Sequence, residues 1–180
     1  VWELIKLANR HPRVNILQPG PGVGGHCIAV DPWFIVDSAP DEAKLIRMAR
    51  LVNDNKPNFV LNKIDCAVSL IGRSKMELKI ACLGLAFKPD IDDLRESPAL
   101  SIMRKISLMG FSEVLLAEPN IFTLPKEFKD KEQLVSLVLA DEAIRAADIV
   151  VLLVDHTPFK SIDLGLLSGK QIIDTRGIWS

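Results

Sequence analysis

The stretch that decides the fold is Lys79–Ala86, which reads Lys-Ile-Ala-Cys-Leu-Gly-Leu-Ala. Its apolar residues follow one another without alternation, which is typical of a strand buried on both faces of a sheet. Downstream of it, further segments read in turn as helix 97–109, strand 113–117, an undecided stretch 132–138, helix 141–147, strand 148–154 and strand 171–174. This alternation predicts an α/β fold with a Rossmann-like doubly wound parallel sheet, covered by helices on each side.

The chain upstream of this region is predicted to be mainly helical. Residues 1–9 read as a helix and 28–36 as a short extended or turn segment, while helical spacing of apolar residues runs from 41 to 71. An interruption near Pro57 predicts either one kinked helix or two helices that meet there. A helix of that length with an apolar stripe needs a partner, either the next domain or a second subunit. The polar segment 72–78 is the expected domain boundary.

Composition excludes several classes of protein. The chain has 180 residues with 22 basic and 23 acidic side chains and a formal net charge of -1, so it lacks the electrostatic footprint of a nucleic-acid-binding protein. Its longest apolar run, 149–154, is far shorter than the roughly 20 residues that span a bilayer. No basic amphipathic stretch indicates binding to a membrane surface. The length suits one domain, or one domain with a helical appendage.

The three cysteines indicate a reducing, cytoplasmic location. Cys27, Cys66 and Cys82 are widely spaced without a CxxC pair, which argues against a disulfide framework and against a structural zinc site, so no metal is expected. Cys66 and Cys82 fall on apolar positions of a helix and a strand and are expected in the core. The chain starts within an amphipathic helix, without an initiator methionine or signal peptide, which predicts that it is a piece of a longer protein.

A glycine loop is the best candidate for chemistry. Residues 19–31 read Pro-Gly-Pro-Gly-Val-Gly-Gly-His-Cys-Ile-Ala-Val-Asp, and they combine flexible glycines with stiffening prolines in front of Cys27. Such a loop suits a thiolate nucleophile held at a fixed angle to a bound carbonyl; the alternative is a tight turn followed by an inert, buried cysteine. Asp31 could orient a water molecule or simply serve a turn. His26 is a poor base for Cys27 if the segment is extended, because adjacent side chains then point to opposite faces.

The loop after the first strand offers a second candidate site. Residues 84–90 lack the GxGxxG pattern, so the pyrophosphate of NAD could not lie there in the usual way, and a different nucleotide is expected in the crevice at the strand ends. Lys88, Arg95 and the helix start at Ser97 would suit phosphate oxygens. Arg95 could instead pair with a neighbouring carboxylate, Asp92, Asp93 or Glu96. Asp155 and His156 end a strand at the crevice, where they either touch a ligand or form a solvated loop.

Four motifs together resemble the UDP-glucose/GDP-mannose dehydrogenase family over nearly the whole chain: the glycine loop, Asn53-Asp54 before Pro57, residues 84–90, and Leu-Arg-Glu-Ser-Pro at 94–98. The resemblance implies a four-electron oxidation of a sugar C6 alcohol to a carboxylate, with UDP-sugar as substrate and NAD as cofactor. Within the family, His26 and the stretch 11–16 favour UDP-N-acetyl-D-mannosamine as substrate. Oxidation of UDP-glucose or UDP-N-acetylglucosamine is the alternative.

The resemblance also implies roles for individual residues. Cys27 corresponds to the nucleophile that forms a thiohemiacetal and then a thioester, and Asp31 to the carboxylate that assists the attacking water. Arg95 corresponds to an arginine near the cofactor. The residues expected to contact substrate are Arg13, Gly22, Gly24, Gly25, Lys88 and Arg176. Arg13 or His11 would serve the substrate of the neighbouring subunit.

The resemblance further implies a division of the chain. Residues 1–76 would hold the active-site loop and a central helical region that builds a homodimer, and residues 77–180 would form the UDP-sugar-binding domain. The NAD-binding domain would precede this segment, so the segment alone is not expected to oxidise a sugar. Two hypotheses from other classes are a non-catalytic nucleotide-sugar-binding or dimerisation module, and a cysteine hydrolase or acyltransferase, which would need a histidine base near Cys27.

Overall fold

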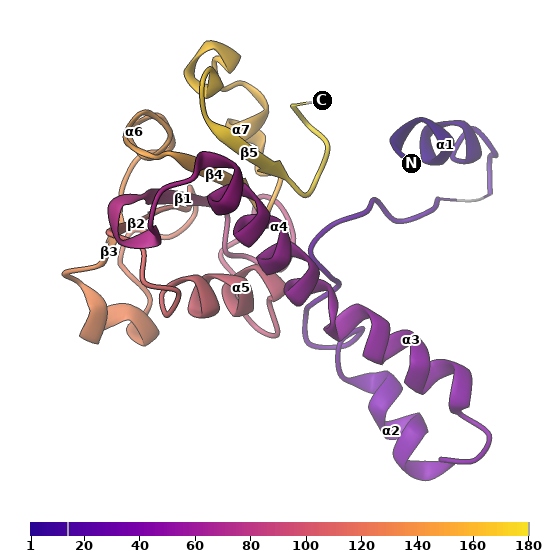
Figure 1. Ribbon diagram of the computed structural model, residues 1–180. Helices are drawn as coiled ribbons and strands as arrows, with labels where there is room; N and C mark the ends of the chain where they lie inside the picture. Colours follow the sequence, from indigo (N-terminus) through magenta and orange to yellow (C-terminus); the bar gives the residue numbers. More distant parts are fainter. Residues whose placement is uncertain (14, 180) are drawn as a thin grey trace.

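A computed structural model describes residues 1–13 and 15–179, and within them it confirms the predicted α/β fold. A five-stranded sheet has the order β3-β2-β1-β4-β5, with every neighbouring pair parallel (Figure 1). The chain therefore builds the sheet outward from β1 in one direction and then returns to add strands on the other side. The strands are β1 (Lys79–Leu83), β2 (Glu113–Ala117), β3 (Val135–Leu137), β4 (Ile149–Leu152) and β5 (Gln171–Asp174).

Helices cover both faces of this sheet, as the unbroken apolar strands require. Ile80 and Cys82 point toward α4 (Lys56–Ile71) and α5 (Pro98–Ile106), whereas Ala81 and Leu83 point toward α6 (Ala140–Ala146) and α7 (Thr157–Lys160). All four of these strand side chains are fully buried. Because successive side chains of a strand face opposite sides, each strand of this kind serves two separate cores. The short 3-10 helices are η1 (Lys75–Glu77), η2 (Lys126–Lys131) and η3 (Leu164–Leu167).

The first part of the chain forms a protruding arm. α1 (Trp2–Ala8) confirms the predicted first helix, and the chain then runs through the glycine loop into α2 (Asp31–Ser38) and α3 (Lys44–Asp54), which lie side by side away from the sheet (Figure 1). α4 follows α3 and packs against α5 and the sheet. The helical half and the sheet half of the chain therefore share a core across α4.

One detail of this region differs from the sequence prediction, and another decides between two predicted arrangements. The segment 28–36 was predicted to be extended or a turn, but α2 begins at Asp31, with Pro32 in its first turn, where the missing amide proton costs nothing. The apolar run that follows Pro32 shows no helical periodicity, which is why the pattern misled the prediction. The long helical segment is two helices, with Asn55 between them and Pro57 in the first turn of α4, which is one of the two arrangements predicted.

The cysteine prediction was half right. Cys82 is fully buried on β1, and burial raises the pKa of its thiol to about 12. Cys66, predicted to be in the core, is exposed. The buried face of α4 consists of Val60, Ile64 and Ala67, and Cys66 lies off that stripe.

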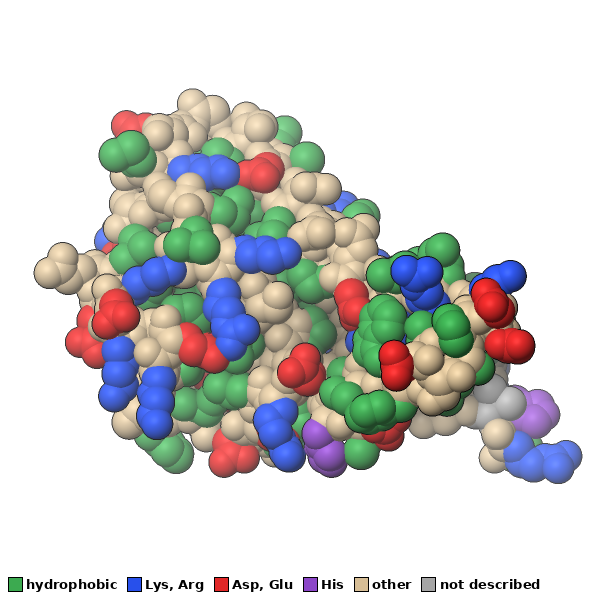
Figure 2. Space-filling model, turned by 90° about the horizontal axis from the view of Figure 1, so that it is seen from below, with side chains coloured by type: hydrophobic (Ala, Val, Ile, Leu, Met, Phe, Trp, Pro, Cys, Tyr) green, Lys and Arg blue, Asp and Glu red, His purple; other side chains and the backbone are tan. Residues whose placement is uncertain are grey.

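α3 has two contrasting faces. Arg50 is buried and Asn53 is half-buried on the side of the glycine loop, whereas Leu45, Met48 and Val52 are exposed on the other side. Figure 2 shows apolar side chains gathered with charged ones on this protruding end of the molecule. The arm thus presents an apolar surface that the described chain does not cover. None of the described helices has the length and apolar character needed to cross a membrane.

Candidate functional site

The candidate site is a crevice where the sheet reverses its direction of growth. β1 lies between β2 and β4, so the loops that leave β1 and β4 diverge at their carboxyl ends and leave a gap between them. Ligands of open α/β sheets bind at such a point. The gap is lined by residues of the glycine loop, of the loop after β1 and of the segments after β4 and β5, among them Pro21, Gly22, Phe87, Lys88, Asp155 and Arg176.

Two cations face this crevice. Lys88 is exposed, with its ammonium group 5.7 Å from the centre of the Phe87 ring. The Arg176 guanidinium donates from Nε to Asp155 Oδ1 over 2.7 Å, and its Nη1 lies against Gly20. A guanidinium held by a carboxylate and an exposed ammonium that line one crevice are suited to binding phosphate oxygens. Gly22, Lys88 and Arg176, three of the predicted substrate contacts, are thus brought together.

The glycine loop lies closely against the chain that leads into α5. A Cβ atom at Gly24 would collide with the Glu96 carbonyl oxygen, and the Gly25 amide donates to the Arg95 carbonyl over 3.3 Å. Gly25 also has a φ of +93°, a conformation that strongly favours glycine. The loop therefore needs these two glycines to approach the α5 segment.

Cys27 is exposed in a turn that follows the glycines. Its carbonyl accepts hydrogen bonds from the amides of Val30 at 3.0 Å and Asp31 at 2.8 Å, and this turn leads directly into α2. Asp31, also exposed, is the first residue of that helix. Because residues 26–30 form a turn and not an extended segment, the argument that His26 must point away from Cys27 does not hold. His26 is instead close enough to Asp93 to lower the pKa of that carboxyl slightly.

Arg95 pairs with Asp93, which confirms the alternative that a neighbouring carboxylate holds it. Its Nε and Nη2 atoms donate to the two carboxylate oxygens over 2.6 to 3.0 Å. Hydrogen bonds from Arg95 lower the pKa of Asp93 to about 2. The pKa of Arg95 is raised, mainly by Asp93 and to a smaller degree by the nearby Cys27. The guanidinium therefore lies within electrostatic range of the sulfur atom.

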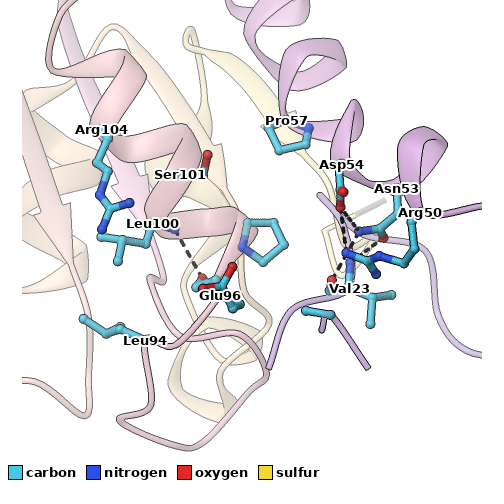
Figure 3. Close-up of a pocket in the computed structure, with 13 residues that line it drawn as sticks. Val23, Arg50, Asn53, Asp54, Pro57, Leu94, Glu96, Leu100, Ser101 and Arg104 are labelled. Atoms are coloured by element: carbon cyan, nitrogen blue, oxygen red, sulfur yellow. Dashed lines mark hydrogen bonds and ion pairs between the residues drawn. The ribbon is translucent and has the colours of Figure 1, made fainter. Parts of the chain in front are cut away.

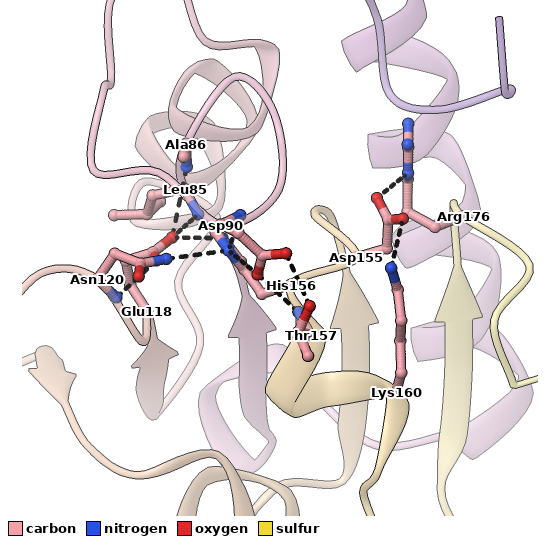
Figure 4. Close-up of polar contacts among 10 residues, drawn as sticks. All are labelled: Leu85, Ala86, Asp90, Glu118, Asn120, Asp155, His156, Thr157, Lys160 and Arg176. Atoms are coloured by element: carbon pink, nitrogen blue, oxygen red, sulfur yellow. Dashed lines mark hydrogen bonds and ion pairs between the residues drawn. The ribbon is translucent and has the colours of Figure 1, made fainter.

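A buried acid–base pair supports the loop that carries Lys88 (Figure 4). His156 Nδ1 accepts a hydrogen bond from the Asp90 amide at 2.9 Å, so Nε2 carries the proton and donates to Glu118 Oε2 at 3.0 Å. His156 was expected to touch a ligand or to be solvated, but it is fully buried. Burial opposes the ionisation of Glu118, yet hydrogen bonds from His156 and from backbone amides outweigh it and lower the pKa of that carboxyl.

Glu118 also occupies the backbone amides of the turn after β1, which would otherwise be available to a dinucleotide. Its Oε2 accepts hydrogen bonds from the amides of Leu85 at 2.7 Å and Ala86 at 3.4 Å. In a dinucleotide-binding fold the amides at this turn face the pyrophosphate. Here a carboxylate of the protein takes their hydrogen bonds, so the residues do not fit NAD at this position. Sequence reasoning missed Glu118, and the only signal was an acidic residue directly after the strand 113–117.

A second hollow of about 300 Å³ lies on the other side of the α5 N-terminus, between α5 and α3 (Figure 3). Asn53, Arg50 and Asp54 of α3 lie on one side of it around Val23 of the glycine loop, and Glu96 and Arg104 lie on the other. Sequence reasoning assigned no role to Asn53. Arg13, a predicted substrate contact, is exposed in the segment after α1 and is not among the residues that line the crevice.

Comparison with known proteins agrees with this architecture. Residues 81–180 match the UDP-binding domain of the UDP-glucose/GDP-mannose dehydrogenase family, and residues 1–55 match the central domain of that family. Among curated proteins, the UDP-N-acetyl-D-mannosamine dehydrogenase of Salmonella typhi is 55% identical over 99% of this chain, which covers 43% of that relative. The NDP-N-acetyl-D-galactosaminuronic acid dehydrogenase of Ralstonia solanacearum is 57% identical over the whole chain, which covers 41% of it.

The chain is also similar to solved structures of dehydrogenases of this kind. The UDP-D-ManNAc dehydrogenase of Pyrococcus horikoshii superposes with a TM-score of 0.80 at 34% identity, over 98% of this chain and 40% of that one. The chain thus spans about two fifths of the length of the relatives it matches. Since the UDP-binding domain model alone covers more than half of the residues, the resemblance found in the sequence is confirmed. The chain belongs to the UDP-glucose/GDP-mannose dehydrogenase family.

Proposed function

We propose that the complete gene product oxidises UDP-N-acetyl-D-mannosamine to UDP-N-acetyl-D-mannosaminuronate, and that this chain supplies its nucleophile and its UDP-sugar site. The observation that carries the proposal is the exposed Cys27 at the end of a glycine loop that also lines a crevice with two cations. In this proposal Lys88 and Arg176 hold the diphosphate of the substrate, and the Cys27 thiol meets the C6 carbon of its sugar. In this proposal the amides of Gly22, Gly24 and Gly25 line the sugar.

The proposed chemistry on this chain starts when the C6 alcohol has been oxidised to an aldehyde. The Cys27 thiolate adds to the aldehyde carbon, a C–S bond forms and the carbonyl oxygen takes up a proton, giving a thiohemiacetal. Loss of a hydride from C6 and of that proton leaves a thioester. Water, assisted by Asp31, then attacks the thioester carbon, the C–S bond breaks, and the thiolate and a carboxylate are released. Arg95 lies within electrostatic range of Cys27, beside the carbon at which this chemistry takes place.

NAD supplies the hydride acceptor for both oxidations when it is bound. In this proposal residues 77–180 do not bind NAD, because Glu118 already accepts the hydrogen bonds of the backbone amides in the turn after β1. We propose that the dinucleotide is bound elsewhere in the complete gene product, with Arg95 as the residue of this chain nearest to it.

One observation favours a second substrate, whose sugar differs in configuration at C2 and C4. The relative named for NDP-N-acetyl-D-galactosaminuronic acid is as similar to this chain as those named for UDP-N-acetyl-D-mannosamine. Incubation of the complete gene product with NAD and either UDP-N-acetyl-D-mannosamine or UDP-N-acetyl-D-galactosamine, with NADH followed at 340 nm, separates the two. We expect turnover with the manno sugar; turnover with the galacto sugar alone would replace the assignment.

The role of Cys27 has its own test. Cys27→Ala in the complete gene product is expected to abolish acid formation and to leave UDP binding unchanged, because the lining of the crevice at Lys88 and Arg176 is untouched. Cys66→Ala is the matched control, since Cys66 is also exposed but lies on α4. Wild-type formation of the uronate by the Cys27 variant would contradict the proposal.

We further propose that residues 1–76, which comprise the protruding arm and α4, form a homodimer through the arm. Residues 77–180 act as the UDP-sugar-binding domain. Leu45, Met48 and Val52 recur at helical spacing on the exposed side of α3, as in a helix that packs against a second copy. Arg13, exposed outside the crevice, would then act on the substrate of the neighbouring subunit.

A further inference from the structure

We propose that Asn53, supported by Arg50, is a positioning residue for Cys27: it fixes the glycine loop to α3 and so sets where the sulfur atom meets the aldehyde. This inference rests on the proposed function of Cys27. It concerns a contact between two segments that lie 30 residues apart in the sequence.

The contact is a two-point hydrogen bond to one residue of the loop. Asn53 Oδ1 accepts from the Val23 amide at 2.8 Å, and Asn53 Nδ2 donates to the Val23 carbonyl at 3.2 Å (Figure 3). The orientation of the side-chain amide is fixed by this pairing, because only its oxygen can accept from an N–H group. Asn53 thus replaces the partners that a neighbouring strand would offer to both polar groups of the Val23 backbone.

A second contact holds the loop on the other side of the cysteine. Arg50 Nη1 donates to the carbonyl of Ile28 over 3.4 Å, and Arg50 Nη2 donates to Asp54 Oδ1 over 2.6 Å. Asp54 Oδ1 also accepts from Asn53 Nδ2 at 3.2 Å, so the three side chains form one network. Arg50 is only 8% exposed, which is unusual for an arginine and marks a side chain held in place. Val23 and Ile28 lie on either side of Cys27 in the sequence. α3 therefore forms hydrogen bonds to the backbone before and after the cysteine.

Other contacts hold the loop by packing: Pro98 lies against Gly22 and Gly24, and Phe87 lies against Gly24 and Gly25. The bonds from Asn53 add the fixation of the polar backbone groups of Val23. Without the two bonds from Asn53, the Val23 backbone would gain freedom, and the turn that carries Cys27 would move with it. A displacement of about 1 Å in a reacting group can lower a rate on the order of 100-fold.

The network and the UDP crevice use different residues. Within the described part of the chain, Phe87, Lys88 and Arg176 of the crevice form no hydrogen bond or ion pair with Asn53, which lines the second hollow. The glycine loop enters the crevice through Pro21 and Gly22, ahead of the residue that Asn53 holds. The inference therefore predicts a specific kinetic pattern, in which the rate of acid formation falls while the affinity for UDP stays the same.

The experiment compares Asn53→Ala, Asn53→Asp and Asn58→Ala in the complete gene product. Asn58 is the matched control: its side chain bonds Asn55 and Lys105 on the surface and does not touch the loop. For each variant, kcat and KM are measured with the UDP-sugar, the Kd for UDP by calorimetry, and the deuterium uptake of the peptide containing residues 19–27 by mass spectrometry. We expect kcat of Asn53→Ala to fall about 10- to 100-fold, with a Kd for UDP within about twofold of wild type, and faster deuterium uptake in the loop peptide.

Asn53→Asp keeps the acceptor for the Val23 amide but replaces the donor to the Val23 carbonyl and to Asp54 Oδ1 by an acceptor, so it should also lower kcat and raise the deuterium uptake. It also carries the test if Asn53→Ala does not fold. Unchanged kcat in the folded Asn53 variants, or a parallel loss of UDP affinity, would overturn the inference. Cys27→Ala measured alongside distinguishes the two proposals: acid formation by that variant refutes the proposed function, whereas its inactivity together with active Asn53 variants refutes only the positioning role.

Discussion

Gly84 is the position at which a single added carbon should perturb both the sheet and the crevice. It follows β1, has a φ of +91°, and its amide donates to the Ala117 carbonyl over 2.9 Å. A Cβ atom there would overlap the Val154 side chain and lie 2.9 Å from the Val154 backbone nitrogen. Backbone cannot rotate away as the end of a flexible side chain can, and Val154 is itself hydrogen-bonded to Leu83. Gly84→Ala must therefore separate the carboxyl ends of β1 and β4.

The expected cost has two parts. A non-glycine residue in the left-handed region costs roughly 1–2 kcal/mol, and overpacking against a rigid neighbour adds roughly 1–3 kcal/mol. The free energy of unfolding should therefore fall by about 2–5 kcal/mol. Gly110→Ala is the control, because Gly110 has a φ of +80° but an added Cβ meets no atom within 4 Å. This control should lose only about 1–2 kcal/mol.

Equilibrium urea unfolding of the 180-residue chain, followed by circular dichroism at 222 nm, measures both variants. The difference between them isolates the contact with Val154, since the cost of the backbone conformation is common to both. If Gly84→Ala loses no more stability than Gly110→Ala, the close approach of the two strands does not constrain this position and the reasoning is wrong.

Three further predictions concern thiols, pH and assembly. In the native chain, Cys27 and Cys66 should react with a thiol reagent, whereas Cys82, buried and with its pKa raised to about 12, should react only after unfolding; labelling of all three in the native state would contradict the fold. Because the pKa of Glu118 is lowered in the folded state, its contribution to stability is complete above about pH 4.3, the usual value for a free glutamate, and is lost as the pH falls through the folded pKa. In Glu118→Gln the free energy of unfolding, measured by urea titration at each pH, should depend less on pH in this acid range. An unchanged pH dependence would exclude Glu118 as its source. Met48→Asp on the exposed side of α3 should convert a dimer of the complete gene product into a monomer in sedimentation velocity, and a variant that stays dimeric would exclude this face as the interface.

The sheet was predictable because its signal is local. The strands hold unbroken apolar runs, such as 80–83 and 149–152, and α5 begins at a recognisable cap, Ser97, whose hydroxyl accepts from the Leu100 amide. α2 was missed because the apolar run after Pro32 lacks helical alternation. A pattern of that kind does not distinguish a strand from a helix that lies at the surface of an arm.

The candidate site was predictable only in part. The glycine loop and Lys88 could be singled out from their residue types and Arg176 from the family resemblance, and the structure brings Gly22, Lys88 and Arg176 to one crevice. Their catalytic and binding roles stay predictions. The contacts of Asn53, which was noted only as part of a motif, and of Glu118, which was missed, could not be found in this way. Their partners lie 30 and 38 residues away, and a hydrogen bond between such distant segments leaves no trace in spacing.

In this domain the Glu118 carboxylate fills the place next to the turn after β1 where dinucleotide-binding folds hold the phosphates of a ligand. A pyrophosphate at this turn would have to displace the Glu118 carboxylate from the Leu85 amide. Moving that carboxylate would also break its hydrogen bond from His156. An ancestral Rossmann fold could abandon dinucleotides by gaining one acidic side chain and its buried base, with no change in the order of its strands.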